Sequence, residues 1–194
     1  MNRLEATGVI VQEADEAPIV ASLGHPAYDL FAAGDRPGNF YTWGSMGLAS
    51  SIGLGLALAR PDLRVYVVDG DGSLLMNLGS LATIGLLQPP NLVVVVMDNE
   101  EYATTGGQAT PTAHGADLEA AARALRIAEA VTVRTEAELQ AALERTAPAP
   151  RVVVAKVVES SPRAKPPLDC VFIKHRFMTA IGAQDAALGG KYTS

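Results

Sequence analysis

The stretch Val65-Tyr-Val-Val-Asp-Gly-Asp-Gly-Ser73 decides the fold. Its first four residues are apolar and predict a buried strand. Residues 74–87 follow with apolar side chains at helical spacing, and residues 92–97 form a second apolar run without polar alternation. Such a run is typical of a strand covered on both faces, as in a parallel sheet. Strand, helix and strand in this order predict a right-handed βαβ crossover.

The rest of the chain continues this alternation of strands and helices. Further strands are expected at residues 19–23, 130–133 and 151–158, with a turn at 35–39, and further helices at 26–33, 45–60, 116–125 and 136–145. The order predicts one α/β domain over residues 1–194, built on an open, doubly wound, mainly parallel sheet with helices on both faces. A Pro-rich connection at 161–167 leads to a C-terminal tail at 168–194.

The composition argues against several classes of protein. Apolar residues make up 48% of the chain and aromatic residues only 5%, so we expect a core of small aliphatic side chains. A formal net charge of −6 argues against a nucleic-acid partner, because binding a phosphate backbone needs clustered Lys and Arg. Cys170, the only cysteine, cannot form an internal disulfide or hold an iron–sulfur cluster by itself.

The sequence favours a cytoplasmic protein that does not span a membrane. Residues 1–18 are mixed and acidic and lack a signal-peptide core. Residues 40–59 carry no charge and have the length of a membrane span. They contain four glycines and three serines, however, which is typical of a small-residue helix buried in an α/β layer.

A candidate phosphate and metal site follows the first strand of the crossover. In open parallel sheets, ligands bind beyond the C-terminal ends of the strands. Gly70, Gly72 and Ser73 offer close backbone approach, a hydroxyl and the start of a helix, all of which suit a phosphate. Asp71 would repel that phosphate unless a divalent cation such as Mg²⁺ lay between them. Asn99, 28 residues later and after the next strand, can supply another oxygen ligand to the same ion.

The alternative interpretation is structural. Asp-Gly pairs are common turn signals, so residues 69–73 could form a tight turn and Asn99 could be a loop residue. Gly-Asp-Gly alone favours this alternative. Asn99 at this spacing, in a strand–helix–strand setting, favours the site.

This combination resembles the motif of the thiamine diphosphate enzymes. The family pattern usually ends in two asparagines, whereas here Asp98 precedes Asn99. The resemblance implies that Asp71 and Asn99 bind Mg²⁺ through their side chains and Glu101 through its backbone carbonyl. It also implies contacts with thiamine diphosphate from the following residues: Gly70, Asp71, Gly72, Ser73, Asn99 and Tyr102.

A second motif strengthens the resemblance. Gly44-Ser45-Met46-Gly47 is similar to the family's Gly-Ser-hydrophobic-Gly turn under the thiamine rings. Met46 is then the wedge that bends the cofactor, with ordinary core packing as the alternative. Residues 33–41, 104–108 and 173–178 are similar to the phosphonopyruvate decarboxylases and to the β subunit of the sulfopyruvate decarboxylases. This similarity implies decarboxylation of a small 2-oxo acid, by electron-sink chemistry that belongs to the cofactor.

The resemblance also implies a missing part. In this family the cofactor is activated by a Glu on a separate pyrimidine-binding domain, for which this chain has no room. Glu13 and Glu16, before the first strand, are interpreted as solvated charges. We therefore expect a split enzyme, in which a pyrimidine-binding-domain subunit supplies the Glu and the cofactor lies at the interface of a hetero-oligomer.

Other functions and smaller candidate sites stay open. Carboligation, a 2-oxo acid oxidoreductase subunit and a non-catalytic cofactor-binding subunit are the alternatives. Residues 104–115 could form a lid, on which Gln108 and His114 are candidate catalytic residues, with a solvated surface loop as the alternative. Residues 174–176, Lys-His-Arg, could receive a phosphonate or sulfonate, or form a solvated patch. His25 has no evident partner.

Overall fold

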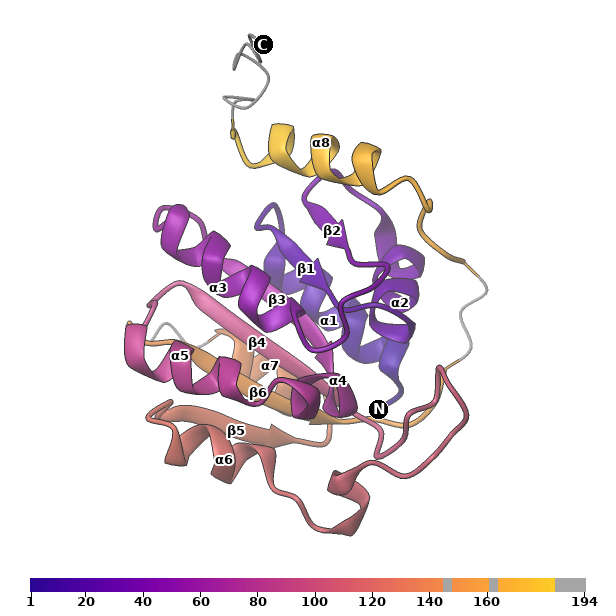
Figure 1. The fold of residues 1–194 in the computed structure, drawn as a ribbon, viewed down its shortest axis with the longest axis vertical. Helices are drawn as coiled ribbons and strands as arrows, with labels where there is room; N and C mark the ends of the chain where they lie inside the picture. The colour runs from indigo at the N-terminus through magenta and orange to yellow at the C-terminus, as the bar shows by residue number, and fades with distance from the viewer. Residues whose placement is uncertain (145–147, 161–163, 184–194) are drawn as a thin grey trace, which may run out of the picture.

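The described part of the chain forms one fully parallel sheet. The computed structural model describes residues 1–144, 148–160 and 164–183. Six strands pair in the order β2-β1-β3-β4-β6-β5 (Figure 1). They are β1 (Ile19–Ala21), β2 (Asn39–Tyr41), β3 (Val65–Gly70), β4 (Leu92–Asp98), β5 (Glu129–Val133) and β6 (Arg151–Lys156). The predicted open, doubly wound sheet is confirmed.

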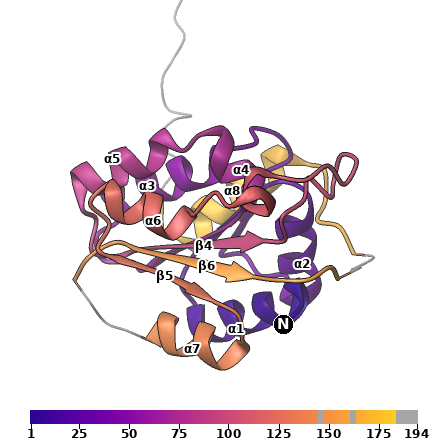
Figure 2. The same cartoon turned by 90° about the horizontal axis from the view of Figure 1, so that it is seen from below.

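Helices cover both faces of this sheet (Figure 2). One face carries α1 (Arg3–Ala14), α2 (His25–Gly34) and α7 (Glu136–Glu144). The other carries α3 (Ala49–Ala59), α4 (Asp71–Met76), α5 (Gly79–Leu87) and α6 (Leu118–Ala124). Strand residues alternate between the two cores: Val67, Val94 and Val154 face the second layer, and Val68, Val95 and Val153 face the first. Both faces are apolar, so the strands read as continuous apolar runs rather than as an alternating pattern.

Two elements near the N-terminus were not predicted from the sequence. Helix α1 begins at a capping box, in which the Asn2 side chain accepts from the Glu5 backbone N–H and the Glu5 carboxylate accepts from Asn2 N. Strand β2 occupies the end of the predicted 35–39 turn and the two residues after it. Only three residues long, it lacks the apolar run that would mark a strand.

Two predicted helices have different limits in the structure. The helix expected at 45–60 begins only at Ala49, because Ser45 and Gly47 have φ of 61° and 88° and form a turn before it. The helix expected at 74–87 is two helices, α4 and α5, which meet at Asn77 and Leu78. The first of them already begins at Asp71, so the Gly-Asp-Gly-Ser stretch enters a helix directly.

The C-terminal tail contains a further helix, α8 (Cys170–Ala180), which was also not predicted. It lies against β2, where the Phe177 and Phe40 rings are 5.2 Å apart (Figure 1). The indole N–H of Trp43 donates to the Pro167 carbonyl at 2.8 Å and fixes the approach to this helix. The start of the Pro-rich connection, the end of the tail and Arg145 lie outside the described residues.

No helix in the described ranges combines the length and the apolar character needed to cross a membrane. Residues 40–59, the uncharged stretch of that length, contain β2, a turn and α3 instead of one long helix.

A pair of glycines on α3 tests how closely this helix packs on the sheet. A methyl group at Gly53 would lie 2.1 Å from Cγ2 of Val67, whereas at Gly55 it would meet nothing within 4 Å. We expect Gly53→Ala to lower the free energy of unfolding by about 1–3 kcal/mol, because overpacking pushes α3 away from β3. Gly55→Ala should leave it unchanged or raise it by up to about 1 kcal/mol through helix propensity. Urea unfolding measures both, and equal losses would contradict this packing.

Candidate functional site

The site lies at the point where the chain reverses its direction across the sheet. From β1 the chain passes through α2 on one face to β2, and from β3 it passes through α4 and α5 on the other face to β4. The ends of β1 and β3 therefore border a crevice, which is where ligands bind in open α/β sheets. The hydroxyls of Ser22 and Ser73 lie 3.1 Å apart across it. Ser73 also accepts from the Gly47 backbone N–H at 2.9 Å and so ties α4 to the turn before α3.

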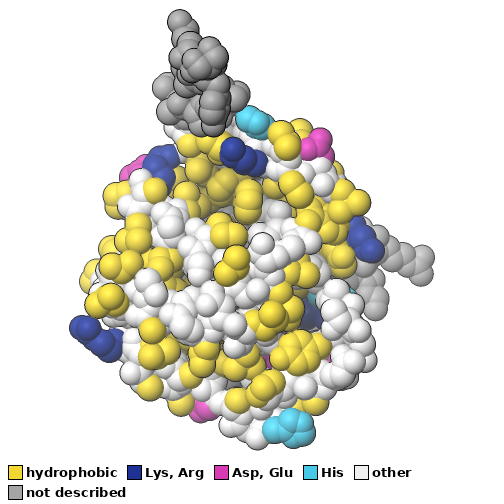
Figure 3. Space-filling model, in the orientation of Figure 1, with side chains coloured by type: hydrophobic (Ala, Val, Ile, Leu, Met, Phe, Trp, Pro, Cys, Tyr) yellow, Lys and Arg dark blue, Asp and Glu magenta, His cyan; other side chains and the backbone are white. Residues whose placement is uncertain are grey.

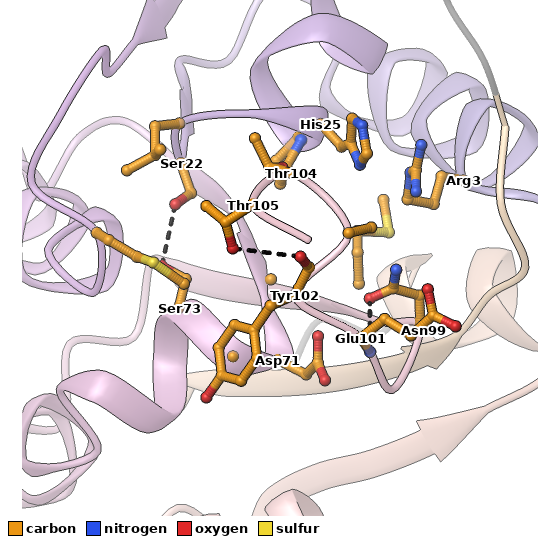
Figure 4. Close-up of a pocket in the computed structure, with 17 residues that line it drawn as sticks. Arg3, Ser22, His25, Asp71, Ser73, Asn99, Glu101, Tyr102, Thr104 and Thr105 are labelled. Carbon is orange, nitrogen blue, oxygen red and sulfur yellow. Dashed lines mark hydrogen bonds between the residues drawn. The ribbon is translucent and has the colours of Figure 1, made fainter. Parts of the chain in front are cut away.

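A pocket occupies this crevice (Figure 4). Eight residues of the predicted cofactor and metal set line it: Met46, Gly70, Asp71, Gly72, Ser73, Asn99, Glu101 and Tyr102. The structure therefore brings the Gly-Asp-Gly-Ser motif, Met46 of the second motif and the Asn99 stretch into one cavity.

Asp71 is a buried carboxylate held by hydroxyl groups. Its Oδ2 accepts from Thr110 Oγ1 at 2.5 Å and lies 3.0 Å from Thr112 Oγ1. Thr112 is also 2.9 Å from Oδ1 of Asp98, at the end of the neighbouring strand. A hydroxyl carries one proton, so Thr112 can donate to only one of these two carboxylates at a time.

Of the two carboxylates, Asp71 and Asp98, it is Asp98 that lies beside a positively charged side chain, that of Lys156. Lys156 Nζ is 2.7 Å from Asp98 Oδ2 and 2.7 Å from Glu100 Oε1. Burial raises the pKa of Asp71 above its usual range, the Thr110 hydroxyl opposes this rise, and the charge of Asp98 adds to it. A divalent cation next to Asp71 would remove this cost, so the residues present fit a metal ion.

The other two predicted ligands flank a strained residue after β4. Glu100 has φ of 64°, which is uncommon for a residue with a side chain. The N–H of Thr110 donates to the Glu100 carbonyl, and that of Tyr102 donates to the Gln108 carbonyl. Asn99 and Glu101 both line the pocket, and their oxygen donors are of the kind that Mg²⁺ prefers.

The loop after Glu101 folds over the pocket and is matched by glycines beneath it. A Cβ on Gly72 would lie 2.3 Å from Cε1 of Tyr102, and one on Gly24 would lie 2.7 Å from Oγ1 of Thr104. Gly24 also has φ of 77°, which a side chain would disfavour. Of the predicted lid at residues 104–115, Thr104 and Thr105 therefore line the pocket, next to Tyr102 and Ala103.

Several predicted residues do not reach this pocket in the structure. Gly44, Ser45, Gln108 and His114 are exposed and lie outside its lining. In the predicted anion-binding run 174–176, Arg176 is engaged elsewhere. Its guanidinium pairs with Asp35 at 2.7 and 2.9 Å and stacks on the Tyr41 and Phe172 rings, at the β2 edge of the sheet.

Other lining residues were not identified from the sequence, among them Arg3, Ser22 and His25. His25 is the first residue of α2 and lines the pocket (Figure 4). Burial, followed by the charge of Arg3, lowers its pKa, so the imidazole is neutral at pH 7. A polar Ser-Leu-Gly-His segment directly after β1 was the signal that could have identified Ser22 and His25.

The chain belongs to the thiamine pyrophosphate enzymes: residues 27–157 match the family's C-terminal TPP binding domain. Over 188 residues it is 42% identical to the sulfopyruvate decarboxylase subunit beta of Methanocaldococcus jannaschii, an alignment that covers 92% of this chain and 96% of that protein. The family resemblance seen in the sequence is thereby confirmed.

Two further comparisons concern longer proteins. The chain is 48% identical over 109 residues to phosphonopyruvate decarboxylase of Streptomyces viridochromogenes, covering 56% of this chain and 27% of that protein. A solved structure from Mycobacterium smegmatis, assigned as a thiamin diphosphate-dependent enzyme, superposes with a TM-score of 0.65 at 23% identity. It covers 82% of this chain and 32% of that chain, and it supports the fold.

The buried charge of Asp71 leads to a stability prediction with a defined pH dependence. Because the pKa is raised in the folded chain, the ionised carboxylate costs stability. That cost is absent below about pH 3.9, the pKa of an Asp side chain in the unfolded chain. It grows as the pH rises to the pKa of Asp71 in the folded chain and is constant above that value. Asp71→Asn keeps an acceptor for Thr110, so without metal it should raise the urea midpoint at pH 7, by an amount that shrinks toward pH 4.

The matched control is Glu136→Gln on α7, which removes an exposed carboxylate far from the pocket and should not change the midpoint. A lower midpoint for Asp71→Asn at pH 7 would mean that the carboxylate stabilises the metal-free fold.

Proposed function

We propose that this chain binds Mg²⁺ and the diphosphate of thiamine diphosphate, as one subunit of a split decarboxylase for a small 2-oxo acid. The observation that carries the proposal is the buried Asp71, which has hydroxyl partners and a second carboxylate beside it and lines a pocket with Asn99 and Glu101. In a metal–diphosphate group, the divalent cation supplies the positive charge that these carboxylates need.

In this proposal, the residues of the chain have distinct roles. Asp71, Asn99 and the Glu101 carbonyl hold the cation, while Ser22, Ser73 and the backbone at Gly72 face the diphosphate. Met46 lies in the pocket lining, on a turn whose Ser45 has φ of 61°, and would contact the thiamine rings. Tyr102 and Thr104 cover the pocket and exclude water. When bound, thiamine diphosphate supplies the electron sink for loss of CO₂ from a 2-oxo acid.

A partner subunit is supported by an uncharged face beside the pocket. Apart from Asp71 at its start, the segment that contains α4 and α5 has no charged residue before Asp98, and α3 has none. Figure 3 shows that the centre of this face presents apolar and neutral polar groups with few charges. Its exposed apolar side chains are Leu48, Ile52, Leu58, Met76, Leu86 and Leu87. Exposed apolar patches occur at interaction sites, so this face supports contact with a partner subunit.

The names and lengths of the relatives support the same conclusion. One is called a subunit beta and is nearly co-extensive with this chain, and the phosphonopyruvate decarboxylase contains much more sequence than the matched part. We infer that a subunit with a pyrimidine-binding domain covers the uncharged face and supplies the activating Glu. The substrate class is a 2-oxo acid with a second anionic group, such as sulfopyruvate or phosphonopyruvate. Gln108 and His114 stay candidate contacts for it.

Calorimetric titration of thiamine diphosphate and Mg²⁺ into the complex of both subunits tests the site. We expect saturable binding that Asp71→Ala weakens at least about 100-fold, because it removes a direct ligand rather than an outer partner. Glu136→Ala should bind as the wild type does. Binding that is absent from the wild-type complex, or unchanged in Asp71→Ala, would contradict the proposed cofactor site.

Release of CO₂ from sulfopyruvate, phosphonopyruvate and pyruvate, measured for each subunit and for the complex, tests the split enzyme. We expect turnover by the complex and none by this chain alone. Full activity of this chain without a partner would overturn the split-enzyme assignment.

A further inference from the structure

The amide of Asn99 can serve a metal ion in only one of its two orientations. Its oxygen can bind a cation, whereas its NH₂ end repels one, and a rotation of 180° about the last side-chain bond exchanges the two ends. A site that uses an Asn ligand therefore depends on a second residue that holds the amide in place.

Glu159, just beyond β6, provides such a contact. Nδ2 of Asn99 lies 3.0 Å from Oε1 of Glu159. An ionised carboxylate only accepts hydrogen bonds, so the NH₂ end is the end that faces Glu159. The amide oxygen is on the side of the Glu101 backbone N–H, at 3.4 Å, and Figure 4 shows Asn99 beside Glu101 at the edge of the pocket. The reverse orientation would place the amide oxygen against a carboxylate.

Arg3 holds Glu159 in position. The Glu159 side chain is 50% exposed, and an exposed carboxylate by itself would be a poor anchor. Nη1 of Arg3 donates to the same Oε1 that accepts from Asn99. The guanidinium is fixed from two other sides, by the Ser160 carbonyl at 2.6 Å and by Asp29 Oδ2 at 2.9 Å, and Arg3 is only 2% exposed.

The backbone explains why Arg3 can reach this place. Val158 N–H donates to the Met1 carbonyl at 3.1 Å, and Arg3 N–H donates to the Val158 carbonyl at 3.2 Å. The start of α1 is therefore tied to the residue that precedes Glu159. Residues 1–3 and 158–160 therefore meet beside the loop that carries Asn99.

We propose that Glu159 and Arg3 are positioning residues, which orient the Asn99 amide so that its oxygen faces the Mg²⁺ site. The proposal rests on the proposed function, because it needs the cation to be bound beside Asn99. It assigns part of the metal site's geometry to residues outside both sequence motifs and outside the matched family domain.

A double-mutant cycle on the complex of both subunits tests this assignment. The measured quantity is the Mg²⁺ concentration that half-saturates thiamine diphosphate binding, determined by calorimetry. Glu159→Ala should raise it about 10–100-fold, the usual effect of losing a residue that orients a ligand. In an Asn99→Asp background, the ligand has two equivalent oxygens and needs no orientation, so Glu159→Ala should have no effect or lower the requirement.

The cycle separates orientation of the amide from a general structural role. A structural role of Glu159 would give the same loss in both backgrounds, and that result, or no loss in either, would overturn the proposal. If Asn99→Asp itself prevents binding, the Glu159→Gln variant decides. The side-chain carbonyl of the new Gln can still accept from Asn99, so this variant should need a Mg²⁺ concentration within about threefold of the wild-type value. A loss equal to that of Glu159→Ala overturns the proposal. Failure of the wild-type complex to bind would contradict the proposed function itself. Glu136→Ala controls for the change in net charge.

Discussion

The parallel register of β3 and β4 is the constraint on which the site depends. Gly70 pairs with Met97, so Asp71, the first residue of α4, lies beside Asp98, the last residue of β4, and Asn99 follows. A shift of one residue exchanges the two faces of a strand, and because both faces of these strands are apolar, such a shift would still bury apolar side chains. Asn91 fixes the register instead: its side-chain NH₂, which has two hydrogens, lies 2.7–3.1 Å from the carbonyls of Ala57, Arg60 and Leu63, and its backbone carbonyl accepts from Val65 N–H at 2.8 Å. A polar anchor at the start of β4 thus sets the position of the ligands at its end.

The central strands could be predicted from the sequence because a short, valine-rich apolar run strongly favours a buried strand. The elements missed were those whose stability comes from tertiary contacts. Helix α1 buries only a narrow stripe that includes Ala6, Ile10 and Ala14, and its capping box was the one local signal of a helix. Strand β2 has three residues and is covered by α8, which in turn buries chiefly Ile173 and Phe177. Each of these elements is recognisable only once its neighbour is in place.

The same distinction applies to the pocket. The motif residues of the pocket lie at the ends of two adjacent strands and on one turn. Their spacing in the sequence was therefore enough to predict that they lie close together. Arg3 reaches the pocket through contacts with Glu159 and Ser160, more than 150 residues away, which no local pattern encodes. Thr110 and Thr112 contact Asp71 because the loop that carries them folds back over it. The positive φ of Glu100 and the space above Gly72 allow this path of the loop.

The order of the strands has a consequence for the synthesis of the chain. Among the strands of the described residues, β6 is the last to be made, yet it lies between β4 and β5. On the ribosome, the free edge of β4 therefore waits until residue 156 has emerged. That edge is an uncharged run from Leu92 to Met97 without proline, a composition typical of segments that aggregate when exposed. A nascent chain that stalls before β6 lacks the strand that pairs with this edge of β4 in the folded structure.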